Sequence, residues 1–342
     1  FGPVIASEGL PWTADRAFAI RDAIVDSNTS VPTYFSLQTA QSVADVEAAV
    51  SHQGTFFVNT IAADRHGNAF YGDLSSTPNL DAATIQECRR SVDGLPGRVI
   101  VLDGSDPGCD WKVTPGSPVP GNLPPEDMPR ATSTEYFTNS NDSYWLSNPD
   151  RPLEGYSPII GDEGTARRLR TRAGLTFVDE AIANGAKLEP DDLRQILFSH
   201  RHFSAELFLD EVLTLCVQPG DEIAASCEVL ANWDRTSNVG SQGTHIWTEF
   251  WAQARRLPNL YVMPFDPADP VNTPRGLALD NPELRQALLD TLAAAQKKLT
   301  DSGIALESDW GDVQFAERNG ERIGIPGAVG SHGSFSYIVT QF

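Results

Sequence analysis

Two short segments combine histidine with serine, residue types that carry nucleophilic and metal chemistry. Ser199-His200-Arg201-His202 places two histidines one residue apart, a spacing that can bind a metal ion. No carboxylate lies at a familiar spacing from this pair, and the segment falls between two expected helices, so a helix-boundary loop is the favoured interpretation. Ser331-His332-Gly333-Ser334 lies in a glycine-rich turn before the last expected strand, and no catalytic role is inferred for it.

Several motifs of well-known enzyme classes are missing from the sequence. There is no G-x-S-x-G, so the nucleophile elbow of an α/β-hydrolase is not supported. There is no G-x-G-x-x-G and no G-x-x-x-x-G-K-[ST], so nucleotide binding has no basis in the sequence. Any catalytic residues must therefore belong to polar segments outside these motifs, positioned by the strands and helices around them.

The clearest structural element is a hairpin within Thr55–Asn79. Phe57-Val58 and Ile61–Ala63 form an apolar, partly β-branched run that is typical of a buried strand. Asp64–Asn68 supplies turn residues, with Gly67 free to adopt a positive φ, and Ala69–Tyr71 begins a second apolar run. His66 lies in this turn and is interpreted as structural rather than catalytic.

A second segment, 136–149, reads YFTNSNDSYWLSNP and carries Asn139 and Asn141. By residue type alone it is a polar loop rich in asparagine and serine. Carboxamide groups can donate hydrogen bonds to a developing negative charge, but the spacing does not require such a role.

The two segments in this order, followed by Leu169–Arg172 (LRTR), resemble the penicillin acylase family of N-terminal-nucleophile (Ntn) amidohydrolases. The resemblance extends from Gly2 to about Val329 and is greatest to the branch with aculeacin A acylase and the acyl-homoserine-lactone acylases. It implies an α+β fold, an αββα sandwich in which residues 1–342 form the body of a β-subunit truncated at both ends. A largely helical block at 162–305 would be an insertion or covering layer within it.

The resemblance also implies residue roles. Asn141 matches the asparagine whose side-chain amide donates to the oxyanion. A following helix carries an arginine that steadies this asparagine, and Arg170 is favoured over Arg167 and Arg168. The alternative for Arg170 is a solvated, arginine-rich helix face.

In the family, the nucleophile is a serine at the N-terminus of the β-subunit, exposed by self-cleavage, and its own α-amine is the general base. This sequence begins with Phe1, which offers no nucleophilic atom. We therefore expect the serine and an early histidine to lie outside it, so that the chain by itself is inactive. An α-subunit cut from the same precursor is the expected partner.

The expected reaction is hydrolysis of an amide that releases a long-chain or aromatic acyl group through an acyl-enzyme. Lipopeptides, N-acyl-homoserine lactones and penicillins are the candidate substrates. No cofactor is needed for this reaction. Calcium binding is still an open alternative, because Pro78 falls where family members with a calcium site supply a carbonyl ligand, but Asp73 by itself would not be enough to bind the ion. Aromatic residues could wall an acyl pocket or simply form core: Phe56, Phe57, Phe70, Tyr144 and Trp145.

The alternative function is a catalytically inactive, acylase-like binding scaffold. The Phe1 start favours it, and the intact surroundings of Asn141 oppose it.

Composition narrows the class of protein. The 342 residues are 40% hydrophobic and carry a formal net charge of -21. Such a charge argues against binding to nucleic acid or to anionic membrane surfaces. No run of about 18 apolar residues exists, so no membrane span is expected, and no signal peptide is visible.

Four cysteines fall into two local pairs, for which we predict the disulfides Cys88–Cys109 and Cys216–Cys227. Four free buried thiols are the alternative. Disulfides would indicate an oxidising compartment, so the protein is expected to be secreted or periplasmic.

Helical periodicity is concentrated after Asp162, with helices expected at 164–184, 189–198, 205–217, 221–233, 245–257 and 281–301. Earlier helices are expected at Thr13–Asp26 and, with Ser42 as N-cap, at Ser42–Ser51. Residues 106–130, rich in proline and glycine, predict a surface excursion. Short strands are expected at 97–104, 312–318, 322–325 and 334–341.

Overall fold

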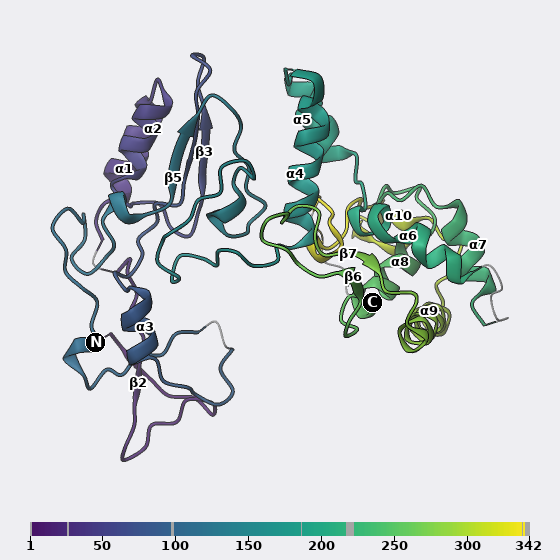
Figure 1. The fold of residues 1–342 in the computed structure, drawn as a ribbon, viewed down its shortest axis with the longest axis horizontal. Helices are drawn as coiled ribbons and strands as arrows, with labels where there is room; N and C mark the ends of the chain where they lie inside the picture. The colour runs from purple at the N-terminus through teal and green to yellow at the C-terminus, as the bar shows by residue number, and fades with distance from the viewer. Residues whose placement is uncertain are drawn as a thin grey trace. The chain divides into compact units, whose positions relative to one another are not determined.

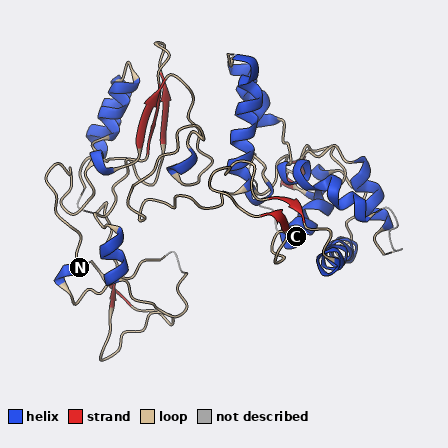
Figure 2. Cartoon of the chain, in the orientation of Figure 1, coloured by secondary structure: helices blue, strands red, loops and turns tan. Residues whose placement is uncertain are grey.

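In a computed structural model of the chain, the predicted hairpin supplies two strands of a three-stranded antiparallel sheet (Figures 1 and 2). Strand β3 (Thr60–Ala63) pairs with β4 (Ala69–Gly72), and β4 pairs on its other edge with β5 (Arg130–Ser133). Every residue of β4 is buried, as expected of a central strand. The expected first apolar pair is not part of the strand: Phe57 has a φ of 53° and is 84% exposed.

The structure describes residues 2–25, 27–96, 99–185, 187–216, 222–336 and 338. The chain divides into two compact units, residues 1–163 and 164–342. The prediction of a single continuous body therefore stays a prediction.

A pair of helices packs on the sheet of the first unit. They are α1 (Ser30–Thr39) and α2 (Val43–Val50), and α2 contacts both β3 and β4. The Ser42 side chain accepts a hydrogen bond from the backbone N–H of Asp45, so the predicted N-cap is confirmed. Val43 and Val50 of α2 meet Phe70 and Leu74 beneath the sheet, in a core completed by Leu123 and Met128.

The helix predicted at Thr13–Asp26 is wrong. Its Thr13 side chain does accept the N–H groups of Asp15 and Arg16, but the Thr13 N–H donates to the Arg16 carbonyl at 2.9 Å and closes a turn. The chain then runs into strand β2 (Phe18–Ala19), which pairs with β1 (Val4–Ile5). Long-range strand pairing has overridden the local helical pattern.

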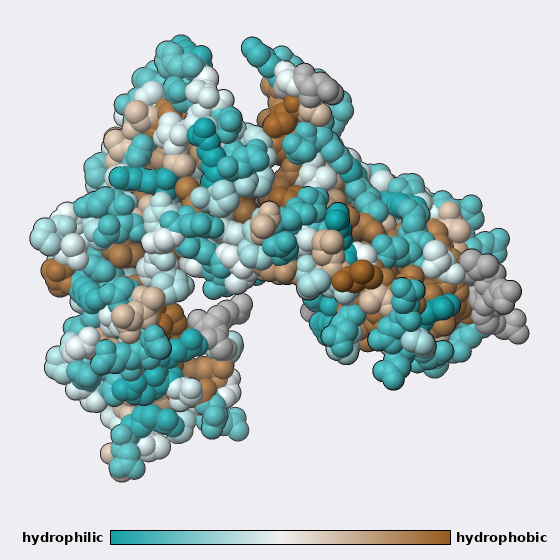
Figure 3. Space-filling view, viewed as in Figure 1, coloured by the Kyte–Doolittle hydropathy of each residue, from teal (hydrophilic) through white to brown (hydrophobic). Residues whose placement is uncertain are grey.

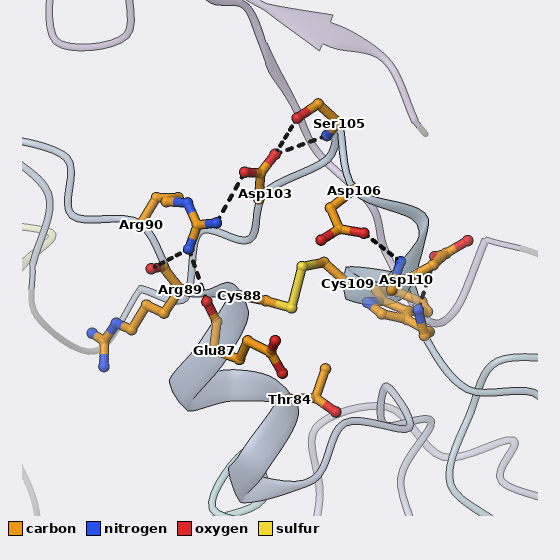
Figure 4. The surroundings of a disulfide bond; sticks show 12 residues. Thr84, Glu87, Cys88, Arg89, Arg90, Asp103, Ser105, Asp106, Cys109 and Asp110 are labelled. Carbon is orange, nitrogen blue, oxygen red and sulfur yellow. Dashed lines mark hydrogen bonds and ion pairs between the residues drawn. A yellow bond between two sulfur atoms is a disulfide. The ribbon is translucent and has the colours of Figure 1, made fainter.

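Both predicted disulfides are formed. Cys88 ends helix α3 (Ala82–Cys88) and is bonded to Cys109 in the short 3-10 helix η1 (Pro107–Cys109), with a Cα–Cα distance of 5.5 Å (Figure 4). Beside this bond, Arg90 pairs with Asp103 at 3.0 Å. The second disulfide joins Cys216 to Cys227, 5.8 Å apart between their Cα atoms.

The proline-rich excursion is only partly at the surface. After η1 it contains a second 3-10 helix, η2 (Pro125–Asp127). Three of its apolar residues are buried, Val119, Leu123 and Met128, and the last two belong to the core under the sheet. As predicted, this proline-rich segment holds no long helix and no central strand, but the burial of its apolar residues draws it inward.

The second unit contains the helical block. Its helices are α4 (Leu169–Ile182), α5 (Pro190–Phe198), α6 (Phe203–Leu215), α7 (Ala224–Asn232), α8 (Thr244–Ala254), α9 (Pro282–Asp301) and α10 (Trp310–Val313), with the 3-10 turn η4 (Ala183–Gly185) after α4. The first six overlap the six predicted ranges, although α4 begins at Leu169 and not at 164. One large apolar core joins α6, α7, α8 and α9. Within it the rings of Trp247 and Trp251 stack at 5.7 Å.

The strands of the second unit are short hairpins. They are β6 (Tyr261–Met263) with β7 (Arg275–Leu277), and β8 (Phe315–Arg318) with β9 (Glu321–Gly324). The turn between β8 and β9 is Asn319-Gly320, as predicted, and both residues have positive φ. Half of the strand expected at 334–341 falls outside the described residues, and residues 334–336 and 338 are not in a strand. The strand expected at 97–104 falls partly outside the described residues. Of the latter, Leu102 forms only a bridge to Arg89.

The prediction of a mixed α+β chain is confirmed, whereas the complete αββα sandwich stays a prediction. In the described part of the chain, no helix is long and apolar enough to cross a membrane. Hydrophilic residues cover most of the face drawn in Figure 3.

Candidate functional site

The asparagine-rich segment forms a loop that is closed at its base. It leaves the sheet after β5 and ends in the 3-10 helix η3 (Tyr144–Leu146). The backbone N–H of Thr138 donates to the Ser147 carbonyl at 2.8 Å, and the Asn148 side chain donates to the Tyr136 carbonyl at 2.9 Å. These two bonds join the ends of the loop, so the residues between them project together.

Asn141 lies at the tip of this loop. It is exposed, although its neighbours Ser140 and Tyr144 are buried. Its φ of 57° lies in the left-handed region, which asparagine tolerates better than most residues. The backbone N–H of Asn141 donates to Oδ1 of Asn139 at 2.8 Å, a local side-chain-to-backbone turn that fixes this geometry.

An acidic residue supports the far side of the loop. The Tyr144 hydroxyl donates to Oε1 of Glu163 at 2.6 Å, and Glu163 also accepts the backbone N–H groups of Gly155 and Tyr156 at 2.9 and 3.0 Å. Burial raises the pKa of the Glu163 carboxyl, but these three hydrogen bonds outweigh that effect and hold it below its usual value. An ionised Glu163 therefore ties η3 to the segment around Gly155.

A polar cluster connects the loop to the sheet. Tyr71, in the middle of β4, is fully buried, and its hydroxyl accepts the Asn59 side-chain amide at 3.0 Å. Burial raises the pKa of the nearby Asp73 to about 6, and a hydrogen bond from Asn59 opposes that shift. No sequence pattern predicts this cluster, because its members come from three separate polar positions around an apolar run.

The arginines predicted to steady Asn141 lie at and before the start of α4 in the second unit. Arg170 is its second residue and is half-buried, and Arg168 is its N-cap. Arg167 donates to the Thr165 carbonyl at 2.9 Å. The role of Arg170 stays a prediction.

Most of the aromatic residues proposed for an acyl pocket belong to the core instead. Phe70, Tyr144 and Trp145 are at most 2% exposed. Phe57 is exposed, and Phe56 is half-buried. The sequence left two interpretations open, a pocket wall and the core. Burial favours the core for Phe70, Tyr144 and Trp145.

The histidine segments occupy structural positions. His66 is exposed in the β3–β4 turn, where its backbone N–H donates to Oδ1 of Asp64 at 2.9 Å. His200 and His202 are both buried at the start of α6. In the described part of the chain, no three His, Cys, Asp or Glu side chains come together as metal ligands. The Pro78 carbonyl accepts the Leu80 N–H at 2.9 Å, and the calcium hypothesis stays a prediction.

Comparison with known proteins gives a consistent result. The penicillin amidase family matches residues 1–337. The chain belongs to the penicillin amidase family. It is 32% identical over 347 residues to the acyl-homoserine lactone acylase PvdQ of Pseudomonas syringae pv. syringae, covering 99% of this chain and 44% of that protein. It is 33% identical over 359 residues to the aculeacin-A acylase of Actinoplanes utahensis, covering 99% of this chain and 44% of that acylase.

This penicillin amidase family member thus spans less than half the length of the relatives it matches. The family resemblance seen in the sequence is confirmed.

Proposed function

We propose that the protein carrying this chain hydrolyses the amide bond between a long aliphatic or aromatic acyl group and a polar head group. Membership of the penicillin amidase family supports amide cleavage. The printed activities of the relatives, acyl-homoserine lactone acylase and aculeacin-A acylase, support an acylated amide as the substrate class. Penicillin is a further member of that class.

The proposed chemistry needs no cofactor. The hydroxyl of an N-terminal serine, supplied by the same precursor, attacks the substrate carbonyl while its α-amine accepts the proton. The carbonyl oxygen becomes an oxyanion, to which the Asn141 side-chain amide donates a hydrogen bond. Collapse of the intermediate breaks the C–N bond, and the amine leaves with a proton. Water then hydrolyses the acyl-serine ester by the same route and releases the acid.

The observation that carries this proposal is the presentation of Asn141. Its backbone is fixed by Asn139 at 2.8 Å in an unusual left-handed conformation, and the residue is exposed at the tip of a closed loop. An oxyanion donor is effective when it is oriented before the charge develops. A loop that holds one asparagine in this way fits that requirement.

The whole protein is proposed to be an αββα sandwich made with an α-subunit from the same precursor, located outside the cytoplasm. The two disulfides support an oxidising compartment. The first test is to express the complete reading frame, measure the intact masses of its chains and sequence their N-termini. A chain that begins with serine supports the enzyme, and the absence of any such chain contradicts it.

Substrate class is tested with acyl-amides of graded chain length and different head groups, by measuring the amine released. Release that rises with acyl length supports the proposal. Binding without release by the intact protein would instead support the acylase-like scaffold.

The role of Asn141 is tested with Asn141→Gly, because glycine accepts the left-handed backbone while removing the carboxamide. We expect kcat to fall by about 10²–10³-fold, as for the loss of one oxyanion donor. Asn319→Gly is the matched control, since Asn319 has a φ of 52° in the exposed β8–β9 turn. It should leave kcat unchanged. Nearly intact turnover in Asn141→Gly would refute the assignment.

A further inference from the structure

The Asn139 side chain makes two hydrogen bonds to the backbone at the tip of the loop. Its Oδ1 accepts the backbone N–H of Asn141 at 2.8 Å, and its Nδ2 donates to the backbone carbonyl of Asp142 at 3.0 Å. One carboxamide therefore holds the backbone at two points across the tip. Both of its functional groups are needed for this, because one accepts and the other donates.

Asn139 is in turn connected to the central strand of the sheet. Its Nδ2 lies 3.5 Å from the hydroxyl of Tyr71, a long contact that is still within hydrogen-bond range. Tyr71 is fully buried in β4, and its hydroxyl also accepts Nδ2 of Asn59 at 3.0 Å. Its ring lies 6.2 Å from that of Phe137, at the start of the loop. The tip of the loop is thus connected to the fully buried central strand of the sheet.

This connection matters because the backbone of Asn141 is in a conformation that non-glycine residues adopt at some cost. Without the two bonds to Asn139, the tip could relax toward an ordinary conformation and carry the Asn141 side chain with it. A displacement of about 1 Å at a catalytic group can lower the rate by about 10²-fold.

We propose that Asn139 is a positioning residue for Asn141 in amide hydrolysis, with Tyr71 as its anchor on the sheet. This inference rests on the proposed function, in which Asn141 donates to the oxyanion. Asn139 acts only through the position of Asn141. Its loss should lower kcat and leave KM nearly unchanged, because substrate binding does not depend on the oxyanion contact.

The decisive experiment is a double-mutant cycle in the protein expressed from its complete reading frame. Asn139→Ala alone should lower kcat by about 10- to 100-fold, with KM changed less than about 3-fold. In the Asn141→Gly background, the same substitution should lower kcat by less than about 2-fold, because there is no carboxamide left to position. Equal losses in the two backgrounds would overturn the inference, as would an unchanged kcat in Asn139→Ala.

The cycle separates this inference from the function on which it rests. If Asn141→Gly retains turnover, the proposed role of Asn141 fails, and the role of Asn139 fails with it. If Asn141→Gly loses turnover but Asn139→Ala lowers kcat equally in both backgrounds, only the positioning role fails.

Two gentler variants keep the test valid if Asn139→Ala does not fold. Asn139→Asp retains the acceptor for the Asn141 N–H and loses both donors, so its kcat should be higher than that of Asn139→Ala and lower than wild type. Tyr71→Phe removes the anchoring hydroxyl, and with it the acceptor for Asn59, while Asn139 stays intact. It should lower kcat by about 3- to 10-fold with KM unchanged. A wild-type kcat in both variants, at matched thermal stability, would contradict the inference.

Discussion

The imidazole rings of His202 and His332 lie 5.4 Å apart, centroid to centroid, in the interior of the second unit. Both residues are at most 1% exposed. His202 Nδ1 lies 3.1 Å from the hydroxyl of Ser204, which also accepts the indole N–H of Trp247 at 2.9 Å. Charge on either ring would be costly here, because no carboxylate in the described part of the chain is bonded to either ring.

The pKa values of both histidines follow from this burial. Burial lowers the pKa of His202 well below its usual value, and His332 adds to that effect. Burial also lowers the pKa of His332 to about 3, with a smaller contribution from Arg255. In the unfolded chain both rings would titrate near a pKa of about 6.5.

Acid is therefore expected to destabilise the second unit. A histidine whose pKa is lower in the folded state contributes stability above about pH 6.5, and this contribution is lost as the pH falls toward about 3. For one such ring, the loss is about 1.4 kcal/mol per pH unit within that window. Urea unfolding at pH 7.5 and 5 measures it. His332→Gln should reduce the pH dependence, whereas His66→Gln, at an exposed turn, should not. Equal slopes in the three proteins would contradict the prediction.

Asp73 should have the opposite pH dependence. Burial raises its pKa to about 6, so the folded state favours the protonated carboxyl. The cost of ionisation appears as the pH rises from about 3.8 through about 6. Asp73→Asn should therefore stabilise the protein by about 1–3 kcal/mol at pH 7.5 and change it little at pH 4. Asp93→Asn, at an exposed position, is the control and should stay within about 0.5 kcal/mol. Urea unfolding at the two pH values tests this prediction. An unfolding free energy of Asp73→Asn no higher than that of the wild type at pH 7.5 would refute it.

The two disulfides should each contribute to stability. They close loops with sequence separations of 21 and 11 residues, for which chain entropy gives about 2–4 kcal/mol each. The paired variants Cys88→Ser with Cys109→Ser, and Cys216→Ser with Cys227→Ser, should both lower the melting temperature. A reductant should lower the melting temperature of the wild-type protein. It should not change the melting temperature of a variant in which all four cysteines are replaced by serine. Mass spectrometry without reductant should find no alkylatable thiol, and four would exclude both bonds.

Local sequence patterns predicted those parts of the fold that local interactions determine. Apolar runs on both sides of the turn at Gly67 predicted the β3–β4 hairpin, and Pro282 and Gly303 predicted the two ends of α9. At Thr13–Asp26 the same reasoning failed, because pairing with Val4–Ile5 decided the conformation of Phe18–Ala19. A pairing between distant segments leaves no periodic signal in either one.

The candidate site shows the same division. Family resemblance pointed to Asn141, but residue types could not show that Asn139 would hold it or that Tyr71 would lie beneath. Those contacts form only when the sheet brings β4 close to the loop, although Tyr71 and Asn139 are about 70 residues apart in the sequence. Within LRTR, the resemblance favoured Arg170 as the residue that steadies Asn141, and that role stays a prediction. The burial of Arg172, half a turn further along α4, was not predicted from the sequence.

Arg172 is expected to be essential for the stability of the second unit. It is 2% exposed, and its guanidinium donates to the backbone carbonyls of Val271 at 2.6 Å and Pro274 at 3.1 Å. Arg172→Met keeps much of the side-chain volume but leaves these acceptors without their donor, which should cost about 2–5 kcal/mol. Arg194→Met is the matched control, because Arg194 pairs with Asp191 at 2.9 Å on the exposed face of α5. It should cost less than about 0.5 kcal/mol. Equal unfolding free energies for the two variants would show that the buried guanidinium is not required to hold the segment that contains Val271 and Pro274.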